Sequence, residues 1–198
     1  MNRLVDTHGY YHITLSSQDA RPLLSSNNER AFVITLLQDL LTPRLLISEI
    51  PEYKQLASCL DLLAFSIRTT SIQLVLFSID ETITDTFAQV VTSRLAEFQS
   101  EYCTKPPAEM RTAVSRLIGP HQALAQTVTI HKAHEDWEYD RYSSIGFYLH
   151  DRRGDWMRMW RVAQLYDNDG ENYRALMTKS GRRLEEPALR STLLPRVA

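Results

Sequence analysis

The stretch that decides the fold is residues 60–79, LDLLAFSIRTTSIQLVLFSI. Two apolar runs, residues 60–67 and 72–79, flank the short polar segment 68–71. Runs of this length, rich in β-branched and aromatic side chains and joined by a few polar residues, are typical of a β-hairpin. Strands with so few polar side chains are usually covered on both faces. The sequence therefore predicts a hairpin in the middle of a sheet.

A helix is predicted on either side of this hairpin. Ser26 with Glu29 forms a capping box, after which apolar residues recur at helical spacing until Pro43. Downstream, Thr82 with Asp85 predicts a second capping box at the start of a longer amphipathic helix. Both helices place their apolar residues on one side, which indicates packing against the sheet.

Two further strands complete the pattern, at residues 10–15 and 111–118. The order strand, helix, strand, strand, helix, strand predicts an α+β, ferredoxin-like βαββαβ fold, an antiparallel sheet with helices on one face. We expect a ferredoxin-like domain over residues 8–134, a C-terminal helical extension of the same domain over 135–180, and a flexible charged tail over 181–198.

The expected extension follows another predicted helix at residues 122–132. The extension itself contains a predicted helix that carries Trp156 and Trp160, and a short helix around residues 173–177. The helical spacing of the tryptophans favours packing on the sheet, although with Trp137 they could also form a stacking surface for DNA.

The composition places the chain among ordinary globular proteins. Its 198 residues are 43% hydrophobic and carry a net charge of -2, which argues mildly against a polyanionic partner. Only Cys59 and Cys103 could form a disulfide, and residues 1–10 lack the apolar centre of a signal peptide. No apolar run reaches the roughly 18 to 20 residues that span a bilayer. We therefore expect a reduced, cytoplasmic protein without a membrane span.

The charge is unevenly distributed along the chain. Residues 1–140 have a net charge of -6 and residues 141–198 a net charge of +4. Arginine dominates the basic part, and its planar guanidinium binds phosphates bidentately. A solvated, acid-balanced helical face is an equally good interpretation. The candidate DNA-binding residues are Arg141, Arg152, Arg153, Arg158 and Arg161.

Several short segments, in this order and spacing, resemble the REP-associated tyrosine transposases, small relatives of the insertion-sequence transposases with a His-x-His site. They are YHIT at 11–14, RPLL at 21–24, ERAF at 29–32, DWEY at 136–139, YSS at 142–144 and FYL at 147–149. The resemblance covers roughly residues 8 to 180. It implies a ferredoxin-like fold and, as partner, DNA that is single-stranded or folded into a hairpin.

The same resemblance implies a cleavage chemistry whose residues are substituted here. In the family, two histidines one residue apart on a strand hold a divalent cation, Mg or Mn, and a helical tyrosine attacks the DNA phosphate. Ser71 and Gln73 occupy the metal-ligand positions, and Thr127 occupies the nucleophile position. A hydroxyl and an amide are weak ligands beside two imidazoles. We therefore expect a transposase-like DNA-binding protein without strand cleavage. We expect no cofactor, and a divalent metal, Mg or Mn, only if activity is retained.

Other interpretations stay open. The fold could instead serve as a protein-interaction or regulatory module that binds no nucleic acid, and the chain could be a monomer or a homodimer. Tyr139 or Tyr142 could replace the lost nucleophile, in which case the protein would be an active enzyme. His131 and His134 could share a metal on one helical face, but a solvated helix end is favoured. His12 is expected to be a packed or hydrogen-bonded sheet residue.

Overall fold

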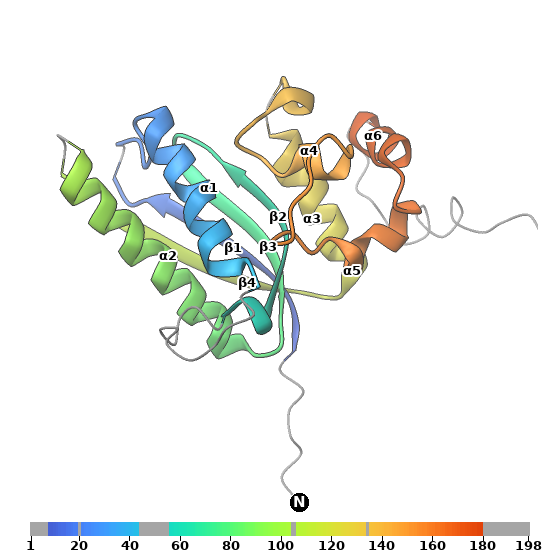
Figure 1. The fold of residues 1–198 in the computed structure, drawn as a ribbon, viewed down its shortest axis with the longest axis horizontal. Coiled ribbons are helices and arrows are strands. Elements are labelled where there is room, and N and C mark those ends of the chain that lie inside the picture. The colour runs from blue at the N-terminus through green and yellow to red at the C-terminus, as the bar shows by residue number, and fades with distance from the viewer. Residues whose placement is uncertain (1–7, 20, 44–55, 104–105, 134, 180–198) are drawn as a thin grey trace, which may run out of the picture.

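A computed structural model describes residues 8–19, 21–43, 56–103, 106–133 and 135–179. Figure 1 shows a central sheet between two layers of helices. The predicted tail at residues 181–198 and His134 lie outside the described residues.

The sheet has four strands in the order β2-β3-β1-β4, and every neighbouring pair is antiparallel. The α+β class and the antiparallel sheet are thus confirmed, and the strands differ from the predicted ones by no more than two residues at either end. The strands are β1 (Gly9–Ser17), β2 (Leu60–Ile67), β3 (Ser71–Ser78) and β4 (Met110–Leu117).

The first face of the sheet packs against α1 (Asn27–Leu41) and α2 (Glu81–Tyr102). Side chains alternate along β1, so Tyr11, Ile13 and Leu15 all point to this face, where they are fully buried. Val33 and Leu37 of α1 join the same cluster. The two helices between the strands therefore lie on one face of the sheet, as predicted (Figure 1). The helix predicted at residues 122–132, which is part of the same predicted domain, covers the other face instead.

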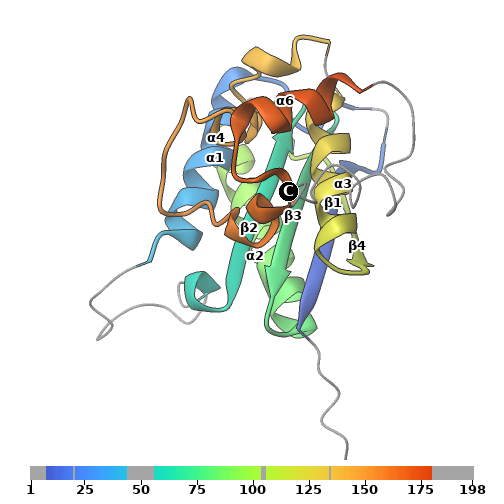
Figure 2. The same cartoon turned by 90° about the vertical axis from the view of Figure 1, so that its right-hand side faces the viewer.

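The second face is covered by the C-terminal part of the chain, which Figure 2 shows on the side opposite α1 and α2. Leu63, Ala64 and Val75 point to this face and pack with Leu124 and Val128 in a second buried cluster. The covering elements are α3 (Pro120–Lys132), the 3₁₀ turn η2 (Trp137–Tyr139), α4 (Ile145–Tyr148), α5 (Trp160–Ala163), the 3₁₀ turn η3 (Gln164–Tyr166) and α6 (Gly170–Thr178).

The C-terminal segment also lies along the outer edge of β2. The predicted hairpin of β2 and β3 is confirmed, but its position in the middle of the sheet is wrong, because β2 is an edge strand. Three backbone hydrogen bonds of 2.8 to 2.9 Å instead join it to later residues, from Ile67 to Tyr142, from Ser144 to Phe65 and from Arg158 to Leu62. All eight residues of β2 are consequently buried, which explains its apolar, central-strand composition.

The helix caps are partly as predicted. Ser26 caps α1, since its hydroxyl accepts from the backbone N–H of Glu29. α2, however, begins one residue before Thr82, and its cap is Asp80, whose carboxylate accepts from the backbone N–H of Thr82 at 2.8 Å. Aspartate and threonine are both good caps, and the earlier residue takes the position here.

The predicted helix through Trp156 and Trp160 is only partly present. Trp156 lies in a turn before α5 and is buried against Phe65 and Phe147, whereas Trp160 opens α5 and is 56% exposed. The final helix is longer than predicted, because Asp169 caps α6 from the preceding turn. Within the described segments, no helix is both long and apolar enough to cross a membrane.

Candidate functional site

A polar strip lies on the second face of the sheet, beside α3. Gln73 of β3 pairs with Thr14 of β1, and Ser71 pairs with Ser16. Because side chains alternate, these four residues share one face. They are half-buried, unlike the fully buried residues between them on the opposite face. The two predicted ligand positions, Ser71 and Gln73, are therefore brought together on the face that carries α3.

His12 marks the end of this strip nearest to α3. Its Nε2 lies 3.4 Å from Gln126 Nε2 and 3.4 Å from Thr14 Oγ1. Burial lowers the pKa of His12, and a hydrogen bond with Gln73 partly offsets this effect. The imidazole is therefore neutral near pH 7, and His12 is a hydrogen-bonded sheet residue, as predicted.

The strip offers hydrogen-bonding groups but weak cation ligands. Hydroxyl and amide oxygens surround a single imidazole. Across the described part of the chain, no group of three or more His, Cys, Asp or Glu side chains could hold a metal ion. These residues do not fit a tightly held transition-metal ion, which takes imidazole, thiolate or carboxylate ligands.

Thr127 faces away from the polar strip. α3 turns Gln126 towards His12, so the next residue points into the second core, where Thr127 has no exposed surface. Its buried hydroxyl has no hydrogen-bond partner among the described residues, and the Tyr148 hydroxyl of the same buried region donates to the carbonyl of Leu63 at 2.9 Å. A nucleophile must reach the phosphate that it attacks. The structure therefore gives Thr127 no path to a substrate on the sheet.

His131 is not the solvated residue that the sequence favoured. It is fully buried, with Nδ1 2.7 Å from the Tyr173 hydroxyl and Nε2 2.7 Å from Ser144 Oγ. Burial lowers the pKa of His131 to about 3, with a smaller contribution from the positive charge of Arg68. Both ring nitrogens are occupied by hydroxyl groups, so this histidine holds the fold together and is not available as a metal ligand.

The five candidate arginines fall into two groups. Arg158 and Arg161 both bind the buried carboxylate of Asp61, at 3.4 and 2.6 Å. The Arg161 guanidinium also lies over the rings of Phe77, at 3.5 Å, and Trp160, at 4.2 Å. This group therefore stacks cationic and aromatic planes at one end of the sheet.

The other three arginines lie around the covered edge of β2. The Arg141 guanidinium lies 4.9 Å from the centre of the Tyr142 ring. Arg152 donates to the backbone carbonyl of Arg141 at 3.1 Å and, with Arg153, lines a shallow hollow beside Trp156. Arg152 thus has a structural role in holding the loop.

A larger hollow of about 660 Å³ opens beside Arg161, and we call it the arginine–aromatic hollow. Phe77 and Tyr10 are cross-strand partners on the second face, with their rings in edge contact at 5.2 Å. The lining residues are His8, Gly9, Tyr10, Phe77, Arg116, Leu117, Ile118, Gly119 and Arg161. Sequence reasoning named only Arg161 of this site, since its aromatic residues come from strands far apart in the chain.

Comparison of this chain with models of known protein families, with curated proteins and with solved structures finds no significant match.

Proposed function

We propose that this chain is a transposase-like protein that binds single-stranded or hairpin DNA without cutting it. The element order and the strand order β2-β3-β1-β4 support a ferredoxin-like fold, because each of α1 and α2 connects two strands that have one antiparallel strand between them. The polar strip and α3 carry Ser71, Gln73 and Thr127, which the resemblance aligns with the family's metal ligands and nucleophile.

The side chains at these positions support the loss of cleavage. Ser71 and Gln73 share a face but offer no imidazole, and Thr127 is buried against the core. An alkoxide would need an adjacent base to form. His12 on the sheet contacts Gln126 instead, and both ring nitrogens of His131 on α3 are occupied by hydroxyl groups. These substitutions leave a surface that can hydrogen-bond a ligand but has no chemistry for phosphoryl transfer.

The observation that carries DNA binding is the stack of Phe77, Arg161 and Trp160. The exposed Trp160 ring can stack on an unpaired base, and Arg161 below it supplies positive charge close to the adjoining phosphate. Asp61 holds the guanidinium of Arg161 in place at 2.6 Å and neutralises part of its charge. The stack therefore favours binding through unpaired bases over binding through the charge of the DNA phosphates alone.

Fluorescence anisotropy with labelled single-stranded, hairpin and duplex DNA tests this proposal. We expect the single-stranded and hairpin oligonucleotides to bind more tightly than the duplex, with affinity that falls as salt rises. Trp160→Ala should weaken binding by about tenfold, which is near the lower end of the affinity loss expected when one stacked base loses its aromatic partner. Tyr102→Ala removes an exposed aromatic side chain from α2 and serves as the matched control. Equal affinity of the two variants would overturn the assignment of the site.

A nicking assay with Mg²⁺ or Mn²⁺ tests the absence of cleavage. We expect hairpin DNA to remain intact with either metal. Metal-dependent nicking that is lost in Thr127→Ala or in Tyr142→Phe would show that the chain is an active enzyme.

Protein binding is the second candidate function, and the exposed strand β4 favours it. β4 forms the other edge of the sheet, and most of its side chains are exposed. An edge strand can accept an extended segment of a partner. Arg111, Thr112 and Ala113 lie on this exposed strand. No DNA binding at low salt would favour this function over the first.

A further inference from the structure

Four arginines gather beside α1, along the covered edge of β2. Arg30 lies on α1, and Arg141, Arg152 and Arg153 lie on the loops before and after α4. The guanidinium carbons of Arg30 and Arg141 lie 4.4 and 4.9 Å from the centre of the Tyr142 ring, so two positive charges share one aromatic side chain. We call these four arginines and Tyr142 the arginine edge.

A shallow hollow of about 340 Å³ continues the arginine edge between α1 and the loop after α4. Arg152 and Arg153 line this hollow on the loop side, and Ile34 lines it on the α1 side. Ile34 follows Arg30 by one helical turn, so both side chains lie on the same side of α1. Arg141 and Arg153 are exposed, so a ligand in solution can reach them.

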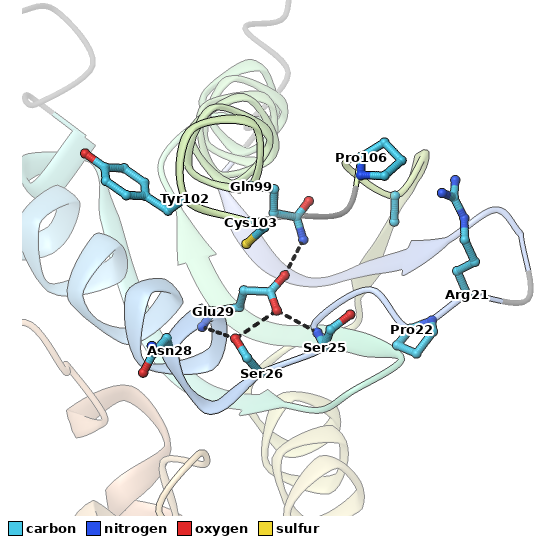
Figure 3. A pocket seen from close by; sticks show the side chains of 11 residues that line it. Arg21, Pro22, Ser25, Ser26, Asn28, Glu29, Gln99, Tyr102, Cys103 and Pro106 are labelled. Carbon is cyan, nitrogen blue, oxygen red and sulfur yellow. Dashed lines mark hydrogen bonds between the residues drawn. The ribbon is translucent and has the colours of Figure 1, made fainter.

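The carboxylate next to Arg30 in the chain is engaged elsewhere. Figure 3 shows Glu29 among the side chains of a pocket between α1 and α2. Its carboxylate accepts from the backbone N–H of Ser25 at 2.8 Å and from the side-chain amide of Gln99 at 2.9 Å. Arg30 donates instead to the neutral side chain of Asn27 at 2.5 Å, and it forms no ion pair with a described residue.

The other neighbouring carboxylates also leave the arginine edge unpaired. Asp140 pairs with Arg68 at 3.8 Å. Asp151 and Asp155 lie close to the arginine edge in sequence, but neither forms an ion pair within the described part of the chain. The arginine edge keeps an excess of positive charge even when both of these carboxylates are counted against it.

We propose that the arginine edge binds the sugar–phosphate backbone of the DNA, at a site separate from the bases that stack on Trp160. This inference rests on the proposed function for the identity of the polymer. A guanidinium binds phosphate oxygens bidentately, and contacts with phosphates hold a protein in position on a nucleic acid. The positive charge is spread along a shallow surface, which suits a row of phosphates better than one enclosed small molecule.

The arginine edge and Trp160 lie at opposite ends of β2. The backbone carbonyl of Tyr142 accepts from Ile67, whereas the backbone N–H of Arg158, two residues before Trp160, donates to Leu62. At about 3.3 Å per residue, these two contacts are roughly 17 Å apart along the strand. Substitutions at one site therefore leave the contacts of the other site in place.

The salt dependence of binding to a labelled oligothymidylate, measured by fluorescence anisotropy, tests the proposal. Each phosphate contact that is lost should reduce the slope of log affinity against log salt by about 0.7 for a single strand. We expect this reduction in Arg141→Gln and in Arg153→Gln, and about twice as much in the double variant. Trp160→Ala should weaken binding without changing the slope, because it removes no charge.

Arg111→Gln is the matched control, since Arg111 is an exposed arginine on β4, at the other edge of the sheet. We expect its slope to equal that of the wild type. Equal slopes in the wild type and in the Arg141→Gln, Arg153→Gln double variant would overturn the proposal.

A ligand without bases separates this proposal from the proposed function. Linear inorganic polyphosphate carries a row of phosphates and has nothing to stack on Trp160. We expect it to bind the wild type at low salt and the Arg141→Gln, Arg153→Gln variant at least about tenfold more weakly. Lysine at both positions keeps the charge and should retain most of the binding.

The two proposals then fail in different ways. If polyphosphate does not bind the wild type, the arginine edge is not a phosphate site, even when DNA binds. If polyphosphate binds through these arginines and DNA does not bind, the phosphate site stands and the DNA-binding function is overturned.

Discussion

The imidazole of His131 and the hydroxyl of Tyr173 lie 2.7 Å apart in the fully buried second core. On its other side, His131 contacts Ser144, which also accepts from the backbone N–H of Phe65 at 2.9 Å. One chain of hydrogen bonds thus runs from α6 through α3 to β2. It joins the last described helix to the sheet.

Tyr173→Phe should lower the free energy of unfolding by about 1 to 3 kcal/mol, because it leaves a buried ring nitrogen of His131 without a partner. Urea denaturation measures this loss. Tyr139→Phe removes the same hydroxyl from a side chain that is 84% exposed, and we expect almost no change there. Similar losses of unfolding free energy in both variants would show that the buried hydrogen bond contributes no more to stability than an exposed hydroxyl does.

Stability should fall in acid because of His131. Its pKa is about 3 in the folded protein and near the usual 6.5 when unfolded, so below pH 6.5 only the unfolded chain takes up the proton. The contribution of this histidine is complete above pH 6.5 and is lost as pH falls towards 3. Between pH 7.5 and 5 the loss is about 2 kcal/mol.

The test compares unfolding of the wild type and of His131→Gln in urea over this pH range, since carboxylates contribute equally to both. We expect a weaker pH dependence in the variant. Parallel curves would contradict the burial of a neutral imidazole.

The sequence predicted the secondary structure of the first part of the chain well, and the reason is local. Capping residues, prolines and apolar periodicity all lie within the element that they define, as at Ser26 and Pro43. The edge position of β2 was missed because the residues that cover it, such as Tyr142 and Arg158, come more than 70 positions later. Their pairing is a tertiary effect that composition does not reveal.

The start of α2 allows a direct test of its cap. Asp80→Ala should lower the free energy of unfolding by about 1 kcal/mol, because the backbone N–H of Thr82 loses its acceptor. Thr82→Ala should cost less, since the Thr82 hydroxyl only donates to the Asp80 carboxylate. Thermal or urea unfolding of the two variants ranks them, and the reverse ranking would place the cap at Thr82.

The polar strip allows a test by gain of function. Ser71→His combined with Gln73→His would place two imidazoles on one face of β3, with His12 on the neighbouring strand. We expect the double variant to bind Zn²⁺ at micromolar or lower concentration and to be stabilised by it, as measured by titration calorimetry and thermal unfolding. The unmodified protein is the control, with at least about tenfold weaker binding.

A single substitution at Ser71 or Gln73 should have a smaller effect, because one ligand is then missing. No zinc binding by a folded double variant would contradict the shared orientation of these positions.

The candidate site was only partly predictable, because much of its geometry also depends on contacts between residues far apart in the chain. The alternation of side chains along β3 is enough to bring Ser71 and Gln73 to one face. The orientation of Thr127 depends on the rotation of α3 about its axis, which is set by how the helix packs in the second buried cluster. The stack of Phe77, Arg161 and Trp160 likewise depends on how the C-terminal turns return to the sheet.

His131 and Tyr173 are 42 positions apart in the sequence, and this separation affects how the chain folds during its synthesis. All four strands leave the ribosome before α6, so the second face of the sheet and the edge of β2 stay uncovered during much of translation. Hydrophobic residues such as Leu63 and Val75 are then open to nonspecific contacts. Folding of this chain is therefore expected to finish late, after Tyr173 has emerged from the ribosome.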